Sequence, residues 1–161
     1  MKTFYIIPGY TDTTRRKQYQ DLAKLAEQKG YKVIKINPDW NKSLSKQAID
    51  VEDNSVIFGF SLGGIIAMIS WDKRKKSKLI LASTTTHLCD NELKGFLPKV
   101  MIKDITNTKN IYLKNYMCFY GEFEREDVKK YVPRNMKITK YIPNTEHVIS
   151  KEYLKEIAKH L

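Results

Sequence analysis

A serine stands among glycines in the segment GFSLGG, which joins two apolar runs of different character. The run VIFGF, residues 56–60, has the composition of a buried strand, and an apolar helical pattern begins at Leu62. Gly-x-Ser-x-Gly between a strand and a helix is the pattern of a nucleophile elbow, a sharp turn that holds a hydroxyl beyond the sheet edge. We therefore predict that Ser61 is a nucleophile. The alternative is a plain tight turn in which Ser61 only caps the helix.

The elements that would position this serine follow from the hydrophobic pattern. Short apolar, β-branched runs predict strands at residues 3–7, 32–36, 55–60, 78–83, 115–120 and 136–141. Helical patterns occupy residues 13–29, 43–50, 62–72, 90–104, 124–131 and 151–160. Runs such as VIF and LILA lack polar alternation, which is typical of strands covered on both faces of a parallel sheet. We predict a single α/β domain over residues 1–161, a three-layer sandwich with a mostly parallel six-stranded sheet.

GFSLGG and its flanks resemble the elbow of the α/β-hydrolase superfamily, and the order of predicted elements matches the core of that fold. The strand at residues 3–7 corresponds to the third strand of the superfamily, so the usual first two strands are absent. The resemblance covers nearly the whole chain and implies a minimal serine hydrolase with little room for a lid. Such an enzyme requires no metal and no organic cofactor.

The resemblance implies two backbone donors for an oxyanion hole. One is the N–H of Leu62, at the start of the helix that follows the serine. The other is the N–H of Tyr10, which follows the first strand in IIPGY. Relatives often carry His-Gly-x at that point, and Pro8 stands in place of the histidine. Two such donors would stabilise a tetrahedral intermediate, whereas the alternative for Pro8–Gly9 is a plain turn.

The resemblance also implies a catalytic histidine near the end of the chain. The sequence has three histidines, and His147 follows the last predicted strand, directly before the final helix. That is where the superfamily places its imidazole. His87 comes before the expected acid, and His160 lies in the last helical pattern. We predict that His147 takes the proton from Ser61 and returns it to the leaving group.

An acid should precede the histidine, because the superfamily order is Ser, acid, His. The segment GEFEREDV follows the strand NYMCFY, and relatives often read Gly-x-x-Asp there. This aligns Glu124 with the acid, while Glu122 and Asp127 are close enough to compete. A charged helix start with no catalytic role is the alternative for all three residues.

A Ser–His–acid site with an oxyanion hole transfers an acyl group to water through an acyl-enzyme. We expect hydrolysis of a carboxylic ester or thioester, and amide cleavage stays open because fold and triad do not set the substrate. The alternative function is a catalytically weak scaffold that acts as a protein-interaction module. Pro8 and the choice among three acids are the features that favour it.

The formal net charge is +11, from 29 Lys and Arg residues against 18 Asp and Glu residues. Such a charge attracts acidic proteins, nucleic acids or anionic lipids. GFSLGG and LILASTTTHL are similar to segments of small esterases that act on pimeloyl-acyl-carrier-protein methyl ester in biotin synthesis, which recognise an acidic carrier through basic residues. An acidic acyl carrier protein is therefore an expected partner. Nucleic acid ranks last, because the run KRKKSK, residues 73–78, has no interleaved aromatic residues for base stacking.

The two cysteines, Cys89 and Cys118, are too few for a disulfide framework and lack a metal-ligand spacing. No apolar segment approaches the roughly 20 residues that a bilayer requires. The apolar run near the N-terminus stops at Pro8, well short of a signal-peptide core. We expect a cytoplasmic protein with no membrane association.

Overall fold

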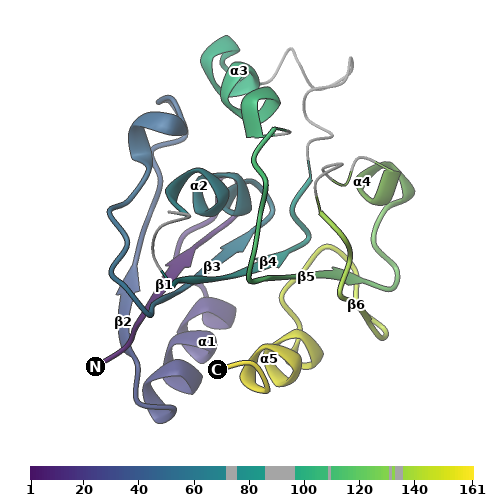
Figure 1. The fold of residues 1–161 in the computed structure, drawn as a ribbon. Helices are drawn as coiled ribbons and strands as arrows, with labels where there is room; N and C mark the ends of the chain where they lie inside the picture. The colour runs from purple at the N-terminus through teal and green to yellow at the C-terminus, as the bar shows by residue number, and fades with distance from the viewer. Residues whose placement is uncertain (72–75, 86–96, 109, 131, 133–135) are drawn as a thin grey trace.

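The computed structural model describes all residues except 72–75, 86–96, 109, 131 and 133–135. The side chains of residues 127 and 130 are also left undescribed. A six-stranded sheet lies at its centre, with every neighbouring pair of strands parallel, in the order β2-β1-β3-β4-β5-β6 (Figure 1). The strands are β1 (Thr3–Ile7), β2 (Lys32–Lys35), β3 (Val56–Phe60), β4 (Lys78–Ala82), β5 (Tyr116–Gly121) and β6 (Lys140–Ile142). The predicted six-stranded parallel α/β sheet is confirmed.

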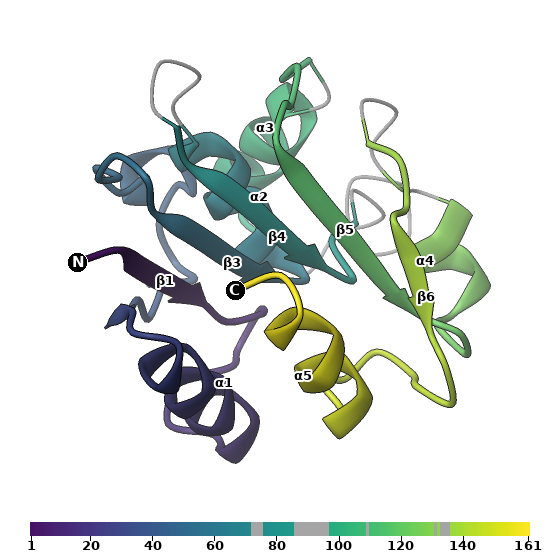
Figure 2. The same cartoon turned by 60° about the horizontal axis from the view of Figure 1, so that its bottom comes forward.

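Helices cover both faces of the sheet and complete three layers (Figures 1 and 2). They are α1 (Lys17–Gln28), α2 (Leu62–Ser70), α3 (Lys99–Thr108), α4 (Glu126–Lys130) and α5 (Lys151–Ala158). One face carries α1 and α5, and the other carries α2, α3 and α4. Successive strand residues point to opposite faces of the sheet, so each face has its own hydrophobic core. Phe4 packs with α1 and α5 in one core, whereas Tyr5 packs with α2 in the other. Both faces of the central strands are therefore buried, as their unbroken apolar runs indicate.

The last strand is shorter and lies later than predicted. Residues 136–141 were expected, but β6 spans only Lys140–Ile142. The ladder to β5 changes character just before β6, where the Cys118 N–H donates to the Thr139 side-chain hydroxyl at 3.0 Å instead of to a main-chain carbonyl. A threonine hydroxyl offers the backbone such an alternative to regular pairing. The pattern of apolar residues carries no sign of this competition.

Two predicted helices also differ from the structure. Residues 43–50 form only a single 3-10 turn, η1 (Ser45–Gln47), because Ser43 and Ser45 direct hydrogen bonds to the buried carboxylate of Asp104. The helix predicted at residues 90–104 lies partly outside the described residues. Its described part, α3, begins after Pro98 and runs on to Thr108. Proline disfavours helical backbone in the residue before it, so a start just beyond Pro98 is expected.

The parallel sheet places four loops at one rim, because the carboxyl ends of parallel strands point the same way. The loop after β1 carries Tyr10, and the elbow after β3 carries Ser61. The loops after β5 and β6 carry Glu124 and His147. All the predicted site residues therefore come from this carboxyl rim.

Candidate active site

Ser61 occupies a strained turn at the end of β3. Its backbone has φ 51° and ψ −123°, a left-handed conformation that L-residues other than glycine rarely adopt. The turn is fixed on both sides, since the Ser61 N–H donates to Ala82 O at 2.8 Å and the Ser61 carbonyl accepts from Gly64 N at 3.0 Å. The side chain makes no capping hydrogen bond to α2. A serine that served only as a helix cap would make that bond, so the plain-cap alternative does not fit.

The elbow packs directly against the turn that follows β1. A Cβ atom on Gly63 would overlap the carbonyl oxygen of Pro8, so only glycine allows this approach. A Cβ on Gly9 would lie 3.3 Å from Ser61 Cβ and 3.1 Å from the Phe60 ring. The Pro8–Gly9 turn therefore lies beside the serine side chain, at the position expected for an oxyanion loop.

The two predicted oxyanion donors have no hydrogen-bond partner among the described residues. Within the described part of the chain, neither the N–H of Tyr10 nor that of Leu62 donates a hydrogen bond. Leu62 opens α2 and is fully buried, which makes its unpaired N–H notable. Helix N-termini and free backbone N–H groups favour negative charge, so these two groups suit an oxyanion.

His147 and Glu124 meet at the same rim. The ring Nδ1 lies 2.8 Å from Glu124 Oε1, and the carboxylate is buried while one edge of the imidazole reaches solvent. When Nδ1 carries the proton toward the carboxylate, a neutral ring presents its lone pair on Nε2, the form a general base requires. The second carboxylate oxygen, Oε2, has no partner among the described residues. The pair thus has the arrangement of a histidine and its orienting acid.

Among the competing residues, Glu122 and His160 serve other contacts. Glu122 is exposed and its Oε2 accepts the N–H of Asn144 at 3.0 Å, which braces the following loop. Asp127 belongs to α4, and its side chain is outside the described atoms. His160 packs against Phe119 and lies 3.4 Å from Glu156. His87 is outside the described residues, and so is Cys89.

The loops after β5 and β6 are joined by contacts that sequence reasoning missed. Phe123 N–H donates to Thr145 O at 2.9 Å, and the Thr145 hydroxyl is 2.9 Å from that of Ser150. A Cβ on Gly121 would overlap the Thr145 carbonyl, so the glycine at the end of β5 permits this contact. In the sequence, only the glycine that opens GEFEREDV pointed to these contacts, because a glycine there indicates a turn. It did not indicate that the turn contacts Thr145.

Phe60 links the serine turn to the His147–Glu124 pair. Its ring lies 5.0 Å from the His147 ring between centroids, and Ser61 follows Phe60 directly. In the described structure, no hydrogen bond joins the Ser61 hydroxyl to His147. Such bonds are often long in ligand-free enzymes and tighten when substrate binds. The structure thus brings the histidine–acid pair to the elbow.

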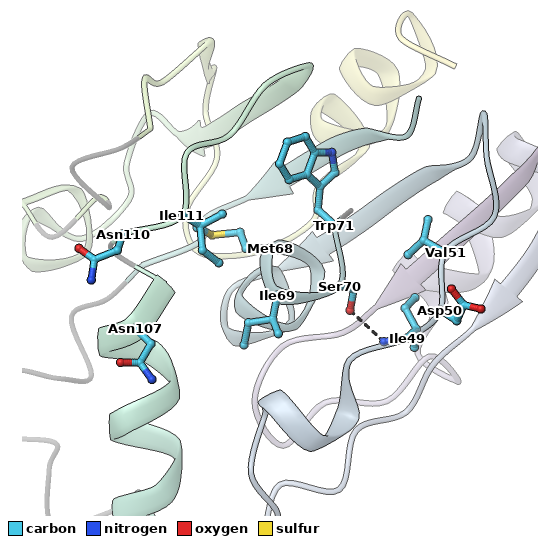
Figure 3. A pocket seen from close by; sticks show the side chains of 10 residues that line it. All are labelled: Ile49, Asp50, Val51, Met68, Ile69, Ser70, Trp71, Asn107, Asn110 and Ile111. Atoms are coloured by element: carbon cyan, nitrogen blue, oxygen red, sulfur yellow. Dashed lines mark hydrogen bonds between the residues drawn. The ribbon is translucent and has the colours of Figure 1, made fainter. Parts of the chain in front are cut away.

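Two cavities lie at the opposite edge of the sheet. One of about 680 Å³ is formed by the C-terminal end of α2, the segment before β3 and the end of α3 (Figure 3). Because α2 is about 13 Å long, this cavity is well separated from Ser61 at the other end of the helix. The second, about 240 Å³, is lined by Lys2, Lys76 and Lys78, and burial lowers the pKa of Lys78. Neither cavity is lined by a predicted site residue.

The described residues include one cysteine, Cys118, which is buried in β5. Burial raises the pKa of Cys118 to about 12, which keeps its thiol protonated and unreactive. Across the described positions, no group of three or more His, Cys, Asp or Glu side chains is placed to hold a metal ion. None of the helices described is both long and apolar enough to cross a bilayer.

No protein-family model matches the chain, and no curated protein does. Solved structures do. Est1E from Butyrivibrio proteoclasticus superposes with a TM-score of 0.69 at 14% identity, over 99% of this chain and 84% of that one. Alpha/beta hydrolase domain-containing protein 10 from mouse gives 0.69 at 14% identity over 98% and 87%, and a lipase-esterase related protein from Clostridium acetobutylicum gives 0.53 at 15% over 99% and 92%. The chain has the α/β-hydrolase fold, as the GFSLGG segment predicted.

Proposed function

We propose that this protein is a serine hydrolase that cleaves a carboxylic ester or thioester through an acyl-enzyme. The observation that supports this most is the buried Glu124 carboxylate hydrogen-bonded to His147, whose ring packs on the residue before Ser61. A buried acid that orients an imidazole beside a strained serine turn has a direct chemical use in acyl transfer. The names of similar structures, among them a lipase-esterase related protein, agree with hydrolysis.

In the proposed mechanism, Ser61 Oγ attacks the carbonyl carbon while His147 Nε2 takes its proton. The negative charge that develops on the carbonyl oxygen is stabilised by the N–H groups of Tyr10 and Leu62. The Glu124 carboxylate stabilises the imidazolium, which then protonates the leaving group. A water molecule, activated by the same imidazole, releases the acid and restores the serine.

The finer proposal is that the ester is presented by an acidic acyl carrier protein, as in the pimeloyl-acyl-carrier-protein methyl ester reaction. Its support is the net charge of +11 and the similarity of GFSLGG and LILASTTTHL to segments of those esterases. A carrier must dock at the carboxyl rim to deliver an acyl group to Ser61. The lysine-lined cavity is at the start of β3, roughly 16 Å from the elbow at its end, so it is not that docking site.

A fluorophosphonate probe, which reacts with activated serines, tests the function. We expect wild-type protein to be labelled at Ser61, the Ser61→Ala variant to be unlabelled, and His147→Ala to react at least about a hundredfold more slowly. A series of p-nitrophenyl esters of increasing chain length then measures the acyl specificity. Folded wild-type protein that stays unlabelled and inactive would instead support the protein-interaction scaffold.

A further inference from the structure

Tyr19, on α1, directs its hydroxyl to the turn that follows β1. The ring is fully buried in the core between α1 and the sheet. Its oxygen accepts the N–H of Gly9 at 3.2 Å, and its proton goes to Asp12 Oδ2 at 3.0 Å. Burial raises the pKa of Tyr19 above its ordinary value, so the hydroxyl keeps its proton and can make both bonds at once.

Asp12 completes the connection back to the turn. Its own N–H donates to the Gly9 carbonyl at 3.0 Å, and its Oδ1 pairs with Arg16 Nε at 2.5 Å. Both backbone polar groups of Gly9 are therefore held, the N–H by Tyr19 and the C=O by Asp12. Glycine is the residue least able to fix its own backbone, so these external bonds determine its orientation.

The held carbonyl determines where the next N–H points. The Gly9 C=O and the Tyr10 N–H belong to one planar trans peptide, in which the two groups point in opposite directions. Fixing the Gly9 oxygen therefore fixes the direction of the Tyr10 N–H. That N–H is left unpaired among the described residues, and its turn lies against the Ser61 side chain.

From this geometry we propose that Tyr19 is a positioning residue for the oxyanion hole, acting through Asp12 and Gly9 to aim the Tyr10 N–H. The proposal rests on the proposed function, because it assigns that N–H to a transition state. Position and burial alone would mark Tyr19 as an ordinary core residue of α1. The two hydrogen bonds distinguish it.

The test is Tyr19→Phe, which keeps the ring in the core and removes only the hydroxyl. We expect kcat on a p-nitrophenyl ester to fall about tenfold with KM changed less than twofold, because the lost alignment matters only as charge develops. The affinity for a boronic acid that mimics the tetrahedral intermediate should fall by a similar factor. The matched control is Tyr31→Phe, a second buried tyrosine whose hydroxyl donates to Leu161 O at 3.2 Å. It should lower thermal stability comparably and leave kcat unchanged.

Conservative rescue separates positioning from general destabilisation. Asp12→Asn retains a side-chain oxygen that can accept from the Tyr19 hydroxyl, so it should keep most of the activity. Asp12→Ala keeps only the main-chain N–H and should resemble Tyr19→Phe. Equal kcat values for the Tyr19→Phe and Tyr31→Phe variants, in protein whose Ser61 reacts with fluorophosphonate, would overturn this proposal and leave the hydrolase function standing. Absence of Ser61 labelling in folded wild type would overturn both.

Discussion

At the scale of single residues, Glu124 is a carboxylate whose surroundings do not favour its charge. A carboxylate is costly to bury, and one of its oxygens has no partner among the described residues. The other oxygen bonds His147, so an imidazolium formed beside it would supply the charge that the site otherwise lacks. The neighbouring Glu122 is exposed and holds the turn at Asn144 instead.

The Glu124→Gln variant should show whether Glu124, and not Glu122, is the acid that orients His147. An amide at this position can present its NH₂ to Nδ1 and favour the wrong tautomer of His147, so we expect kcat to fall by roughly 10³ to 10⁴. The control is Glu122→Gln, which loses the same charge but keeps an oxygen for the Asn144 N–H. It should retain activity within about tenfold. Steady-state kinetics on one ester measure both, and the reverse ranking would assign the acid to Glu122.

At residue scale, the sequence limits the choice of candidate residues wherever it carries a motif. Ser61 follows from its glycines, and His147 from its place between the last strand and the last helix. The acid stayed open among Glu124, Glu122 and Asp127, because residues two or three positions apart in a loop can each point to the histidine. Only the side-chain contacts distinguish Glu124 from Glu122.

At the scale of elements, the loops after β5 and β6 behave as one unit. Main-chain bonds join Glu122 to Ile142 and Phe123 to Thr145, so the segments that carry Glu124 and His147 are held against each other. The close approach depends on Gly121, which has no Cβ to collide with Thr145.

Gly121→Ala should therefore reduce activity as well as stability. The added methyl must push the loops apart, and a displacement of about 1 Å at catalytic groups can lower kcat by about a hundredfold. Overpacking of this kind lowers the free energy of unfolding by about 1–3 kcal/mol. Gly30→Ala provides the control. Its φ of +83° strains alanine, but no atom lies within 4 Å of the added Cβ, and Gly30 is remote from the candidate site. If both variants lost activity equally, stability rather than loop register would explain the effect.

Two of the elements that the sequence misplaced share a cause. Strongly apolar runs such as those of β1, β3 and β4 were located within a residue or so, because burial dominates their conformation. The turn at Ser45–Gln47 and the edge strand β6 depend on side-chain hydroxyls that bond distant groups, namely Asp104 and Cys118 N. Hydrophobic periodicity does not record such long-range hydrogen bonds.

At the scale of the whole molecule, the candidate site residues and the cavities lie at opposite edges of the sheet. The carboxyl rim carries the elbow, the Pro8–Gly9 turn and the His147–Glu124 pair, whereas both cavities and the lysines Lys2, Lys76 and Lys78 lie at the amino edge. The net charge of +11 acts over both edges at low salt. Its effect on catalysis depends on whether the substrate itself is charged.

Salt dependence therefore tests the carrier-protein proposal. Raising NaCl from about 50 to about 500 mM should lower kcat/KM for an ester on acyl carrier protein by about tenfold, because screening removes electrostatic steering. The value for a small neutral ester should change less than twofold. Equal responses of the two substrates would remove the carrier from the proposal and leave the hydrolase.

The site is assembled from parts that are far apart along the chain. The strained serine and the β1 turn belong to the first half, and the acid and imidazole arrive with β5, β6 and their loops. Ribosomes deliver the amino-terminal portion first, so a growing polypeptide exposes an elbow that has no base. If the proposed mechanism holds, hydrolytic activity would begin only once β6 and the loop that carries His147 have docked, and a shorter nascent chain would be inactive.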